Sequence, residues 1–266
     1  MRFLRYPGGK TKLLNFLYNF IPKNQDIKGT YIEPFIGGGS VFLFTKPSKA
    51  ILSDINKELI ELYKGIKNSP HKVWEIFCSF PEGKKAYYLT RDSKYFDRPL
   101  SYRAARTLYL NRTCFKGMWR QSQNGNFNVG YGGESRRWAI THENIIEISK
   151  LLQKTSLQTS DFEQVLENAN EDDFIFLDPP YKPGQKELIE SHYTYSKFTF
   201  DDQVRLSNKL KEINKRKKIK WIMTNSSSSE IRNLYKEFNI IKIPNGVSEK
   251  IGIQTVNSQE ILIKNF

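Results

Sequence analysis

The chain has 266 residues with 42 basic and 28 acidic side chains, which gives a formal net charge of +14. A hydrophobic fraction of 38% and an aromatic fraction of 14% are typical of a folded chain and exclude a disordered one. No apolar stretch approaches the ~20 residues that a membrane-spanning helix needs, so no membrane role is expected. Two cysteines and three scattered histidines predict neither a disulfide framework nor a metal site, and they favour a reducing cytoplasm.

The first quarter of the chain alternates between helical and strand-like patterns. We predict a helix over residues 12–20, a strand over 31–33, a helix beginning at Ser40, a strand over 50–53 and a helix over 57–67. The first of these strands leads directly into a glycine-rich loop. This alternation is typical of an α/β fold with a mostly parallel sheet.

The middle of the chain breaks the alternation and carries most of the charge excess. Residues 71–112 predict basic helices, and residues 118–133, rich in asparagine, glutamine and glycine, predict a loop or hairpin. Between Lys84 and Arg137, twelve basic residues stand against three acidic ones, an excess of +9. Because these cations are interleaved with aromatic residues and asparagines, they predict contacts to the phosphates and base edges of a nucleic acid.

The strand–helix alternation resumes after about residue 140. The elements predicted there are strands over 173–177 and 219–224 and helices over 201–211 and 230–238. Asp201 is expected to cap the first of these helices. The chain then closes with two strand-like runs, 251–256 and 260–263, which predict a terminal antiparallel hairpin.

A glycine-rich loop follows the first predicted strand, with the sequence Glu33-Pro34-Phe35-Ile36-Gly37-Gly38-Gly39. Glycines directly after a strand allow the backbone to approach a ligand closely, although the same pattern also serves as a plain turn. Asp54 ends the next strand, 17 positions after Gly37, close to the spacing at which an acidic residue holds a nucleoside ribose. The two features together predict a nucleoside-containing cofactor at the carboxyl ends of the strands.

The strand DFIFL leads directly into Asp178-Pro179-Pro180-Tyr181. Because proline fixes φ and has no N–H group, the backbone carbonyls of this segment are held in place with few local donors. A carboxylate and a carbonyl can each accept one hydrogen of an exocyclic amine, and the tyrosine ring can stack on the base. The alternative is a simple stop between strand and loop, which the upstream glycine-rich loop disfavours.

At this point the chain resembles the Dam-type DNA adenine-N6 methyltransferases. The motifs that carry the resemblance are, in order, RYPGGK, EPFIGGGSVF, SDINKELIELY, YLNRTCFKGMWR, NGNFNVGYG, SDF, DPPY and TYSKFTFDDQ. The resemblance implies the S-adenosylmethionine-dependent methyltransferase sandwich, a mostly parallel seven-stranded sheet with a terminal antiparallel hairpin, plus an inserted helical target-recognition domain. It implies a catalytic domain at 1–55 and 146–266 and a target-recognition domain at 56–145.

The resemblance also implies a site for S-adenosylmethionine. Asp54 would hold the ribose hydroxyls, and Asp161 with Phe162 would bracket the adenine. The full set of cofactor-binding residues implied in this way is Tyr6, Gly8, Gly9, Lys10, Glu33, Pro34, Phe35, Ile36, Gly37, Gly38, Gly39, Asp54, Asp161, Phe162 and Asp178. The first four of these would lie near the methionine end of the cofactor.

A DNA-contacting hairpin is implied at about 119–132. The residues expected to bind DNA are Arg5, Arg91, Arg112, Phe115, Lys116, Met118, Trp119, Arg120, Asn124, Asn126 and Asn128. The chain departs from the family pattern in having Lys116 for asparagine, Gly130 for proline, Arg5 for lysine and Tyr6 for tryptophan. These departures bear on the target sequence, for which GATC is the first expectation and another adenine-containing palindrome the second.

The implied activity is transfer of a methyl group from S-adenosylmethionine to N6 of adenine in duplex DNA, by base flipping and direct displacement. The implied catalytic residues are Asp178, Pro179, Pro180 and Tyr181. The protein is expected to act as a monomer on DNA in the cytoplasm, either alone or beside a cognate restriction endonuclease that acts separately. Two alternatives stay open from the residues alone: a methyltransferase for RNA or a protein amide, and a non-catalytic DNA-binding protein.

Overall fold

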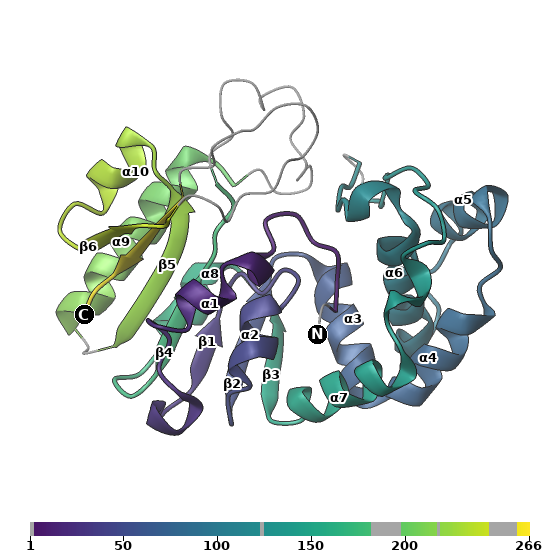
Figure 1. Ribbon diagram of the computed structural model, residues 1–266, viewed down its shortest axis with the longest axis horizontal. Coiled ribbons are helices and arrows are strands. Elements are labelled where there is room, and N and C mark those ends of the chain that lie inside the picture. The colour runs from purple at the N-terminus through teal and green to yellow at the C-terminus, as the bar shows by residue number, and fades with distance from the viewer. Residues whose placement is uncertain (1–2, 123–124, 182–197, 217–218, 245–259) are drawn as a thin grey trace.

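A seven-stranded sheet forms the centre of the computed structural model, which describes residues 3–122, 125–181, 198–216, 219–244 and 260–266 (Figure 1). The strands are β1 (Tyr31–Glu33), β2 (Ala50–Asp54), β3 (Thr155–Thr159), β4 (Phe174–Leu177), β5 (Lys220–Ser226), β6 (Asn239–Lys242) and β7 (Glu260–Lys264). Their order is β3-β2-β1-β4-β5-β7-β6, in which the first five run parallel and β7 is antiparallel to both neighbours. The predicted α/β fold with a mostly parallel seven-stranded sheet is confirmed.

The central strands are apolar on both faces because helices cover both faces of the sheet. In β4, Phe174 and Phe176 belong to one apolar cluster, whereas Ile175 and Leu177 belong to the other. Successive side chains of a strand point to opposite faces, so an uninterrupted apolar run is what a doubly covered strand requires. This explains the run FIFL directly before Asp178.

The helices divide between these two clusters and a region beyond the edge of the sheet. They are α1 (Leu14–Leu17), α2 (Ser40–Thr45), α3 (Lys57–Asn68), α4 (Pro70–Ser79), α5 (Lys84–Asp92), α6 (Leu100–Thr113), α7 (His142–Leu152), α8 (Phe162–Glu167), α9 (Phe200–Arg216) and α10 (Ser229–Leu234). Helices α8, α9 and α10 cover one face, and α2 and α3 contribute to the cluster on the other. Figure 1 shows α4, α5 and α6 on the far side of α3 from the sheet.

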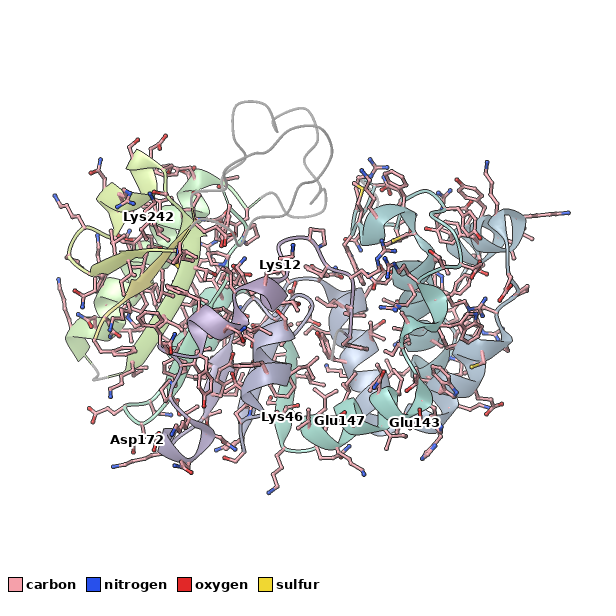
Figure 2. All side chains as sticks on the ribbon, in the orientation of Figure 1. Lys12, Lys46, Glu143, Glu147, Asp172 and Lys242 are labelled. Carbon is pink, nitrogen blue, oxygen red and sulfur yellow. The ribbon has the colours of Figure 1, made fainter. Side chains whose placement is uncertain are left out.

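The helical region shares its core with the sheet. Helix α3 packs on α6 and α7, and α4 packs on the same two helices. Buried residues of this region, such as Phe77 and Tyr109, belong to the same apolar cluster as Leu52 of β2. Near the lower edge of the view in Figure 2, an ion pair of 3.2 Å between Lys46 and Glu147 joins the end of α2 to α7. The division into two domains, at 56–145 and the remainder, stays a prediction.

Several predicted elements differ in detail. The helix expected over 12–20 is a short 3₁₀ turn, η1 (Lys10–Lys12), followed by α1, which ends at Leu17, before the predicted stop at Pro22. The helix expected over 230–238 ends at Leu234, and β6 follows it. The middle segment forms a hairpin, with bridges that pair Cys114 with Tyr131 and Gln121 with Phe127.

Two further expectations concern the last third of the chain. Thr199, not Asp201, caps α9: its backbone N–H donates to Asp202 at 2.7 Å, and its hydroxyl accepts from the backbone N–H of Asp202 at 3.4 Å. This reciprocal pair satisfies donors that a helix start leaves free, which explains why Asp201 is not the cap. Within the described residues, β7 pairs with β5 and β6, while the other predicted hairpin strand, 251–256, lies outside them. In the part of the chain that is described, no helix has the length and apolar character needed to cross a membrane.

Candidate active site

A cavity of about 420 Å³ opens at the carboxyl ends of β1, β2 and β4. The connections from β1 lead to β2 on one side, whereas β4 lies on its other side, so the cavity lies where the strand order reverses. Open parallel sheets bind ligands at this point because neighbouring loops separate there. The predicted residues that line the cavity are Tyr6, Gly8, Gly9, Lys10, Glu33, Pro34, Phe35, Ile36, Gly37, Gly38, Asp54, Trp119, Asp161, Phe162, Asp178, Pro179, Pro180 and Tyr181.

The glycine-rich loop turns tightly beneath this cavity. Gly37 has a φ of 46°, and its N–H donates to Asp54 at 3.1 Å. Gly39 precedes α2 with a φ of 66° and lies between the lining residues Gly38 and Ser40 without lining the cavity itself. A Cβ atom at Gly39 would lie 2.6 Å from the Tyr63 hydroxyl, which itself donates to the Gly37 carbonyl at 2.9 Å. Glycine is therefore required here both by the left-handed backbone and by the close approach of Tyr63.

Two carboxyl groups in the cavity have raised pKa values. Burial raises the pKa of Asp54 to about 6, although backbone N–H donors from Asn56 and Gly37 act in the opposite direction. Burial also raises the pKa of Glu33 to about 8, and the nearby charge of Asp178 adds to this, whereas a hydrogen bond of 2.7 Å from Tyr31 lowers it. Burial disfavours the charged form, so both groups ionise more readily if a cation enters the cavity.

Aromatic side chains form the wall of the cavity beyond Asp54. The rings of Phe35 and Phe162 have centroids 5.5 Å apart, and Phe198 lies edge-on to Phe35 at 5.7 Å. Asp161 caps α8 by accepting from the backbone N–H of Glu163 at 2.9 Å. On the same lining, Ile55 is 55% exposed, an apolar side chain that a flat apolar ligand would cover.

Asp178 lies at the end of β4 in a cluster of charged and polar groups. Its Oδ1 atom is 2.8 Å from Lys10 Nζ and accepts a hydrogen bond of 2.7 Å from the Thr224 hydroxyl. The Tyr181 hydroxyl donates to the same oxygen at 3.4 Å, and Lys10 lies 4.8 Å from the centre of the Tyr181 ring. Burial alone would lower the pKa of Lys10, but the charges of Asp178 and Glu260 outweigh it and raise the pKa. Lys10 is thus a fixed cation that holds the carboxylate in place.

The N-terminal segment contacts α6 and the hairpin next to the cavity. The backbone N–H of Arg5 donates to Asn111 at 3.0 Å, and Asn111 donates back to the Arg5 carbonyl at 2.6 Å. A Cβ atom at Gly117 would lie 2.3 Å from the Arg5 side chain, so this contact requires glycine. The rings of Tyr6 and Trp119 lie 5.6 Å apart. Trp119 and Gln121 therefore bring the hairpin into the wall of the same cavity.

The residues predicted to bind DNA divide into exposed and buried ones. Phe115, Lys116, Arg120 and Asn126 are exposed on the hairpin, and Met118 and Asn128 are half-buried. Arg120 donates through Nε to the Asn128 side chain at 2.8 Å. Lys116 has a φ of 52°, in the left-handed region that asparagine adopts more readily than lysine. Asn124 lies outside the described residues.

Three other predicted DNA-binding residues have contacts within the protein. The side chain of Arg112 is 2% exposed and lies in the core, and Trp119 is 3% exposed. Arg91 donates to both carboxylate oxygens of Asp92, at 2.7 and 3.1 Å, and to the Val129 carbonyl at 3.3 Å. The structure therefore brings the predicted cofactor and catalytic residues together at one cavity, but it does not bring all the predicted DNA-binding residues to one surface.

Two neighbours of the Asp178 segment were not predicted from the sequence. Thr224 of β5 binds Asp178, and Gln203 of α9 donates to the Pro180 carbonyl at 3.0 Å. A signal for Thr224 exists in the sequence, because it lies in the strand predicted at 219–224 and parallel neighbours end at the same edge of a sheet. Gln203 is the last residue of the motif TYSKFTFDDQ, but the motif does not indicate its contact with Pro180, which depends on how α9 packs beside the Asp178 segment.

Comparison with known proteins identifies the family. Residues 6–247 match the family described as "D12 class N6 adenine-specific DNA methyltransferase". The match covers most of the chain, and the chain therefore belongs to this family of adenine-specific DNA methyltransferases. Membership in a family of enzymes that methylate DNA speaks against both alternatives that the residues alone left open.

Relatives in bacteria and archaea support the same assignment. The chain is 35% identical to "Type II methyltransferase M1.LlaDCHI" of Lactococcus lactis subsp. cremoris, over 91% of this chain and 86% of the relative. It is 34% identical to "Type II methyltransferase M.MjaIII" of Methanocaldococcus jannaschii, over 99% and 98%. It is 27% identical to a "DNA adenine methylase" of Vibrio cholerae, over 92% and 89%.

Proposed function

We propose that this adenine-specific DNA methyltransferase takes its methyl group from S-adenosylmethionine and transfers it to N6 of an adenine flipped out of a short duplex sequence, with GATC the first to test. One observation carries the proposal: a single cavity is lined by the glycine-rich loop and Asp54, by Asp178 to Tyr181, and by Trp119 of the hairpin. The methyl donor, the target amine and the DNA-reading hairpin would thus meet at one cavity.

The lining of the cavity fits the proposed cofactor in charge and shape. S-adenosylmethionine carries a positively charged sulfonium and an ammonium group, and the lining holds the carboxyl groups of Glu33, Asp54 and Asp161. Asp54 accepts one backbone N–H on each carboxylate oxygen, which leaves lone pairs for two ribose hydroxyls. The exposed side chain of Ile55 and the ring of Phe162 offer apolar surface to the adenine.

The proposed chemistry is a direct displacement in which the chain holds the acceptor amine. When bound, S-adenosylmethionine supplies an electrophilic methyl group. Asp178 and the Pro179 carbonyl accept the two hydrogens of the target amine, which draws the nitrogen toward tetrahedral geometry and stabilises its developing positive charge. The N–C bond forms as the S–C bond breaks, and one amine proton then leaves to water. In-line alignment supplies the other large part of the rate enhancement.

Flipping the base costs a few kcal/mol, because pairing and stacking are lost. Stacking on Tyr181 would offset part of this cost, since a base–aromatic stack contributes about 1–3 kcal/mol. Phe115, which is 49% exposed on the hairpin, would face bases in the major groove. We propose that residues 56–145 act as the target-recognition domain, and that the enzyme acts as a monomer in the cytoplasm, alone or beside a separate restriction endonuclease.

The proposed reaction is tested by incubating the protein with tritiated S-adenosylmethionine and duplex DNA that contains GATC. We expect radioactive N6-methyladenine after digestion to nucleosides, and little or none from RNA or from duplexes without the target. Methylation of RNA in preference to DNA would contradict the proposed substrate, and a protein that binds DNA but shows no calorimetric binding of S-adenosylmethionine would contradict the proposed donor.

Arg120 is expected to read one base of the target. Arginine binds the O6 and N7 atoms of guanine in a bidentate manner, which discriminates against a wrong base by about 1–3 kcal/mol. We therefore expect Arg120→Ala to relax specificity at one position of the target in competition assays with single-base variants. Equal weakening on all sequences would instead identify Arg120 as a phosphate contact. Lys116→Ala on the same hairpin serves as the comparison variant.

Binding of the cofactor is expected to depend on pH through Asp54 and Glu33. The raised pKa values, about 6 and about 8, mean that both carboxyl groups take up protons in the empty site, whereas the cationic ligand favours their ionised forms. Binding should therefore release protons: the affinity should fall by up to tenfold for each pH unit between about 8 and 6, where Glu33 takes up a proton, and by up to a hundredfold for each unit below about 6, where Asp54 takes up a second one. Calorimetry between pH 5 and 8 measures the affinity for S-adenosylmethionine, and Asp54→Asn should make that affinity less dependent on pH below about 6. An affinity independent of pH in this range would contradict it.

A further inference from the structure

Two polar residues lie at the end of β5, next to the Asp178 segment. Leu177 of β4 pairs with Met223 of β5, so the residues that follow them, Asp178 and Thr224, emerge side by side at the carboxyl edge of the sheet. Thr224 and Asn225 are both 0% exposed. A buried polar group without a partner is costly, so these two side chains must have specific partners.

The partner of Thr224 is one particular oxygen of the carboxylate. Its hydroxyl donates to Asp178 Oδ1 at 2.7 Å, and Lys10 and Tyr181 approach the same oxygen at 2.8 and 3.4 Å. Among the described residues, no hydrogen bond reaches Asp178 Oδ2. Three donors on Oδ1 fix the rotation of the carboxylate, and within the described residues Oδ2 keeps its lone pairs for another donor.

The partner of Asn225 leads to the next carbonyl. Asn225 donates to the side-chain oxygen of Gln203 at 3.1 Å, and Gln203 donates to the Pro180 carbonyl at 3.0 Å. Gln203 is itself 1% exposed. The described part of the chain places no hydrogen bond on the Pro179 carbonyl. The pair Asn225–Gln203 therefore occupies one of the two proline carbonyls and holds the Asp178-to-Tyr181 segment from the side of α9.

We propose that Thr224, Gln203 and Asn225 are positioning residues that select the two acceptors for the target amine. They occupy Asp178 Oδ1 and the Pro180 carbonyl, so that Asp178 Oδ2 and the Pro179 carbonyl face the amine. This inference rests on the proposed role of Asp178. It adds that a threonine hydroxyl on a neighbouring strand sets the direction in which the carboxylate accepts.

Thr224→Val tests the proposal because valine keeps the shape of threonine and removes only the hydroxyl. We expect kcat for methyl transfer to fall by about 10-fold to 100-fold, since a small misplacement of a reacting group has effects of this order. The KM values for DNA and for S-adenosylmethionine should stay within about twofold, because Thr224 touches neither in the proposed arrangement. Thr224→Ser, which restores the hydroxyl, should recover most of kcat.

A second readout involves no chemistry. Duplexes that carry either adenine or purine, which lacks the amine, at the target position are bound with S-adenosylhomocysteine present. The ratio of the two affinities reports the hydrogen bonds to the amine. We expect this ratio to drop by about fivefold in Thr224→Val relative to the unchanged protein, which corresponds to one ordinary hydrogen bond. Taking the ratio within each protein cancels the different costs of flipping the two bases.

Gln203→Met extends the test to the second carbonyl, with its melting temperature measured in parallel because the change leaves Asn225 and Pro180 without their partner. A fall in kcat with a retained fold supports the proposal, and a variant that does not fold leaves the decision to Thr224→Val. Full activity and an unchanged affinity ratio in Thr224→Val would overturn the inference. If Asp178→Ala is inactive in the same assay, only the inference fails; if Asp178→Ala is active, the proposed function itself fails.

Discussion

Replacing Asp178 with alanine is expected to reduce methyl transfer to DNA by at least about 10²–10³-fold, the range seen when one preorganised group of an active site is removed. The carboxylate accepts a hydrogen of the target amine in the proposed reaction, and no other acidic side chain among the described residues occupies the end of β4. DNA and S-adenosylmethionine should still bind, because the hairpin and Asp54 are unchanged. Incorporation of tritiated methyl groups, measured beside calorimetric binding, separates the two effects.

Asp178→Asn is the matched control for this prediction. Asparagine keeps the size of the side chain, and its oxygen can still accept from Lys10 and Thr224. Its amide nitrogen would then replace Oδ2 with a donor, so the amine would meet a donor where it needs an acceptor. We expect Asp178→Asn to be as inactive as Asp178→Ala but more stable. Substantial transfer by either variant would contradict the role assigned to Asp178.

Replacing Arg137 with methionine is expected to lower the free energy of unfolding by about 3–5 kcal/mol, the usual cost of removing one partner of a buried ion pair. Arg137 is 0% exposed, and its NH2 atom donates to the carbonyls of Phe77 and Phe80 at 2.9 and 2.6 Å. It also lies 3.6 Å from Glu134 and 4.9 Å from the centre of the Tyr109 ring. Urea unfolding measures the loss, since the carbonyls at the end of α4 would lose their donor.

The adjacent residue provides the control. Arg136 is exposed, and surface substitutions away from special contacts change stability by no more than about 0.5 kcal/mol. Arg136→Met removes the same charge from the sequence but leaves the core intact. If the two variants proved equally stable, the buried contacts of Arg137 would contribute nothing to the stability of the fold.

The contrast between Arg136 and Arg137 also shows what the charge excess does and does not indicate. Twelve basic residues between Lys84 and Arg137 predict a surface for DNA, yet Arg106, Arg112 and Arg137 are at most 2% exposed. Sequence counts cannot distinguish a cation that faces solvent from one that holds buried carbonyls. The remaining cations are still numerous enough for DNA binding that weakens strongly with added salt.

Much of the fold could be predicted because its signals are local. The apolar run before Asp178, the turn at Gly37 and the asparagine that caps α3 each determine their own surroundings. Strand β6 could not be predicted in this way, because its pattern continues from the amphipathic helix before it. It pairs with β7, which lies some 20 residues further along the chain, and no local pattern encodes a contact at that separation.

The candidate site shows the same division between local and long-range signals. The motifs place Asp54 and Asp178 at strand ends, and parallel strands bring those ends together. The ion pair between Lys10 and Asp178 joins segments 168 positions apart, and Gln203 reaches Pro180 from a separate helix. Such contacts depend on packing, so sequence patterns indicated the acceptors of the proposed reaction but not the side chains that orient them.

The most direct test of the account is to sequence methylated adenines in DNA from cells that lack adenine methylation and express this chain. We expect N6-methyladenine at nearly every copy of one short sequence, with GATC the first expectation, and none in cells that express the Asp178→Ala variant. DNA without N6-methyladenine, from cells in which the unchanged protein is folded and abundant, would contradict the account.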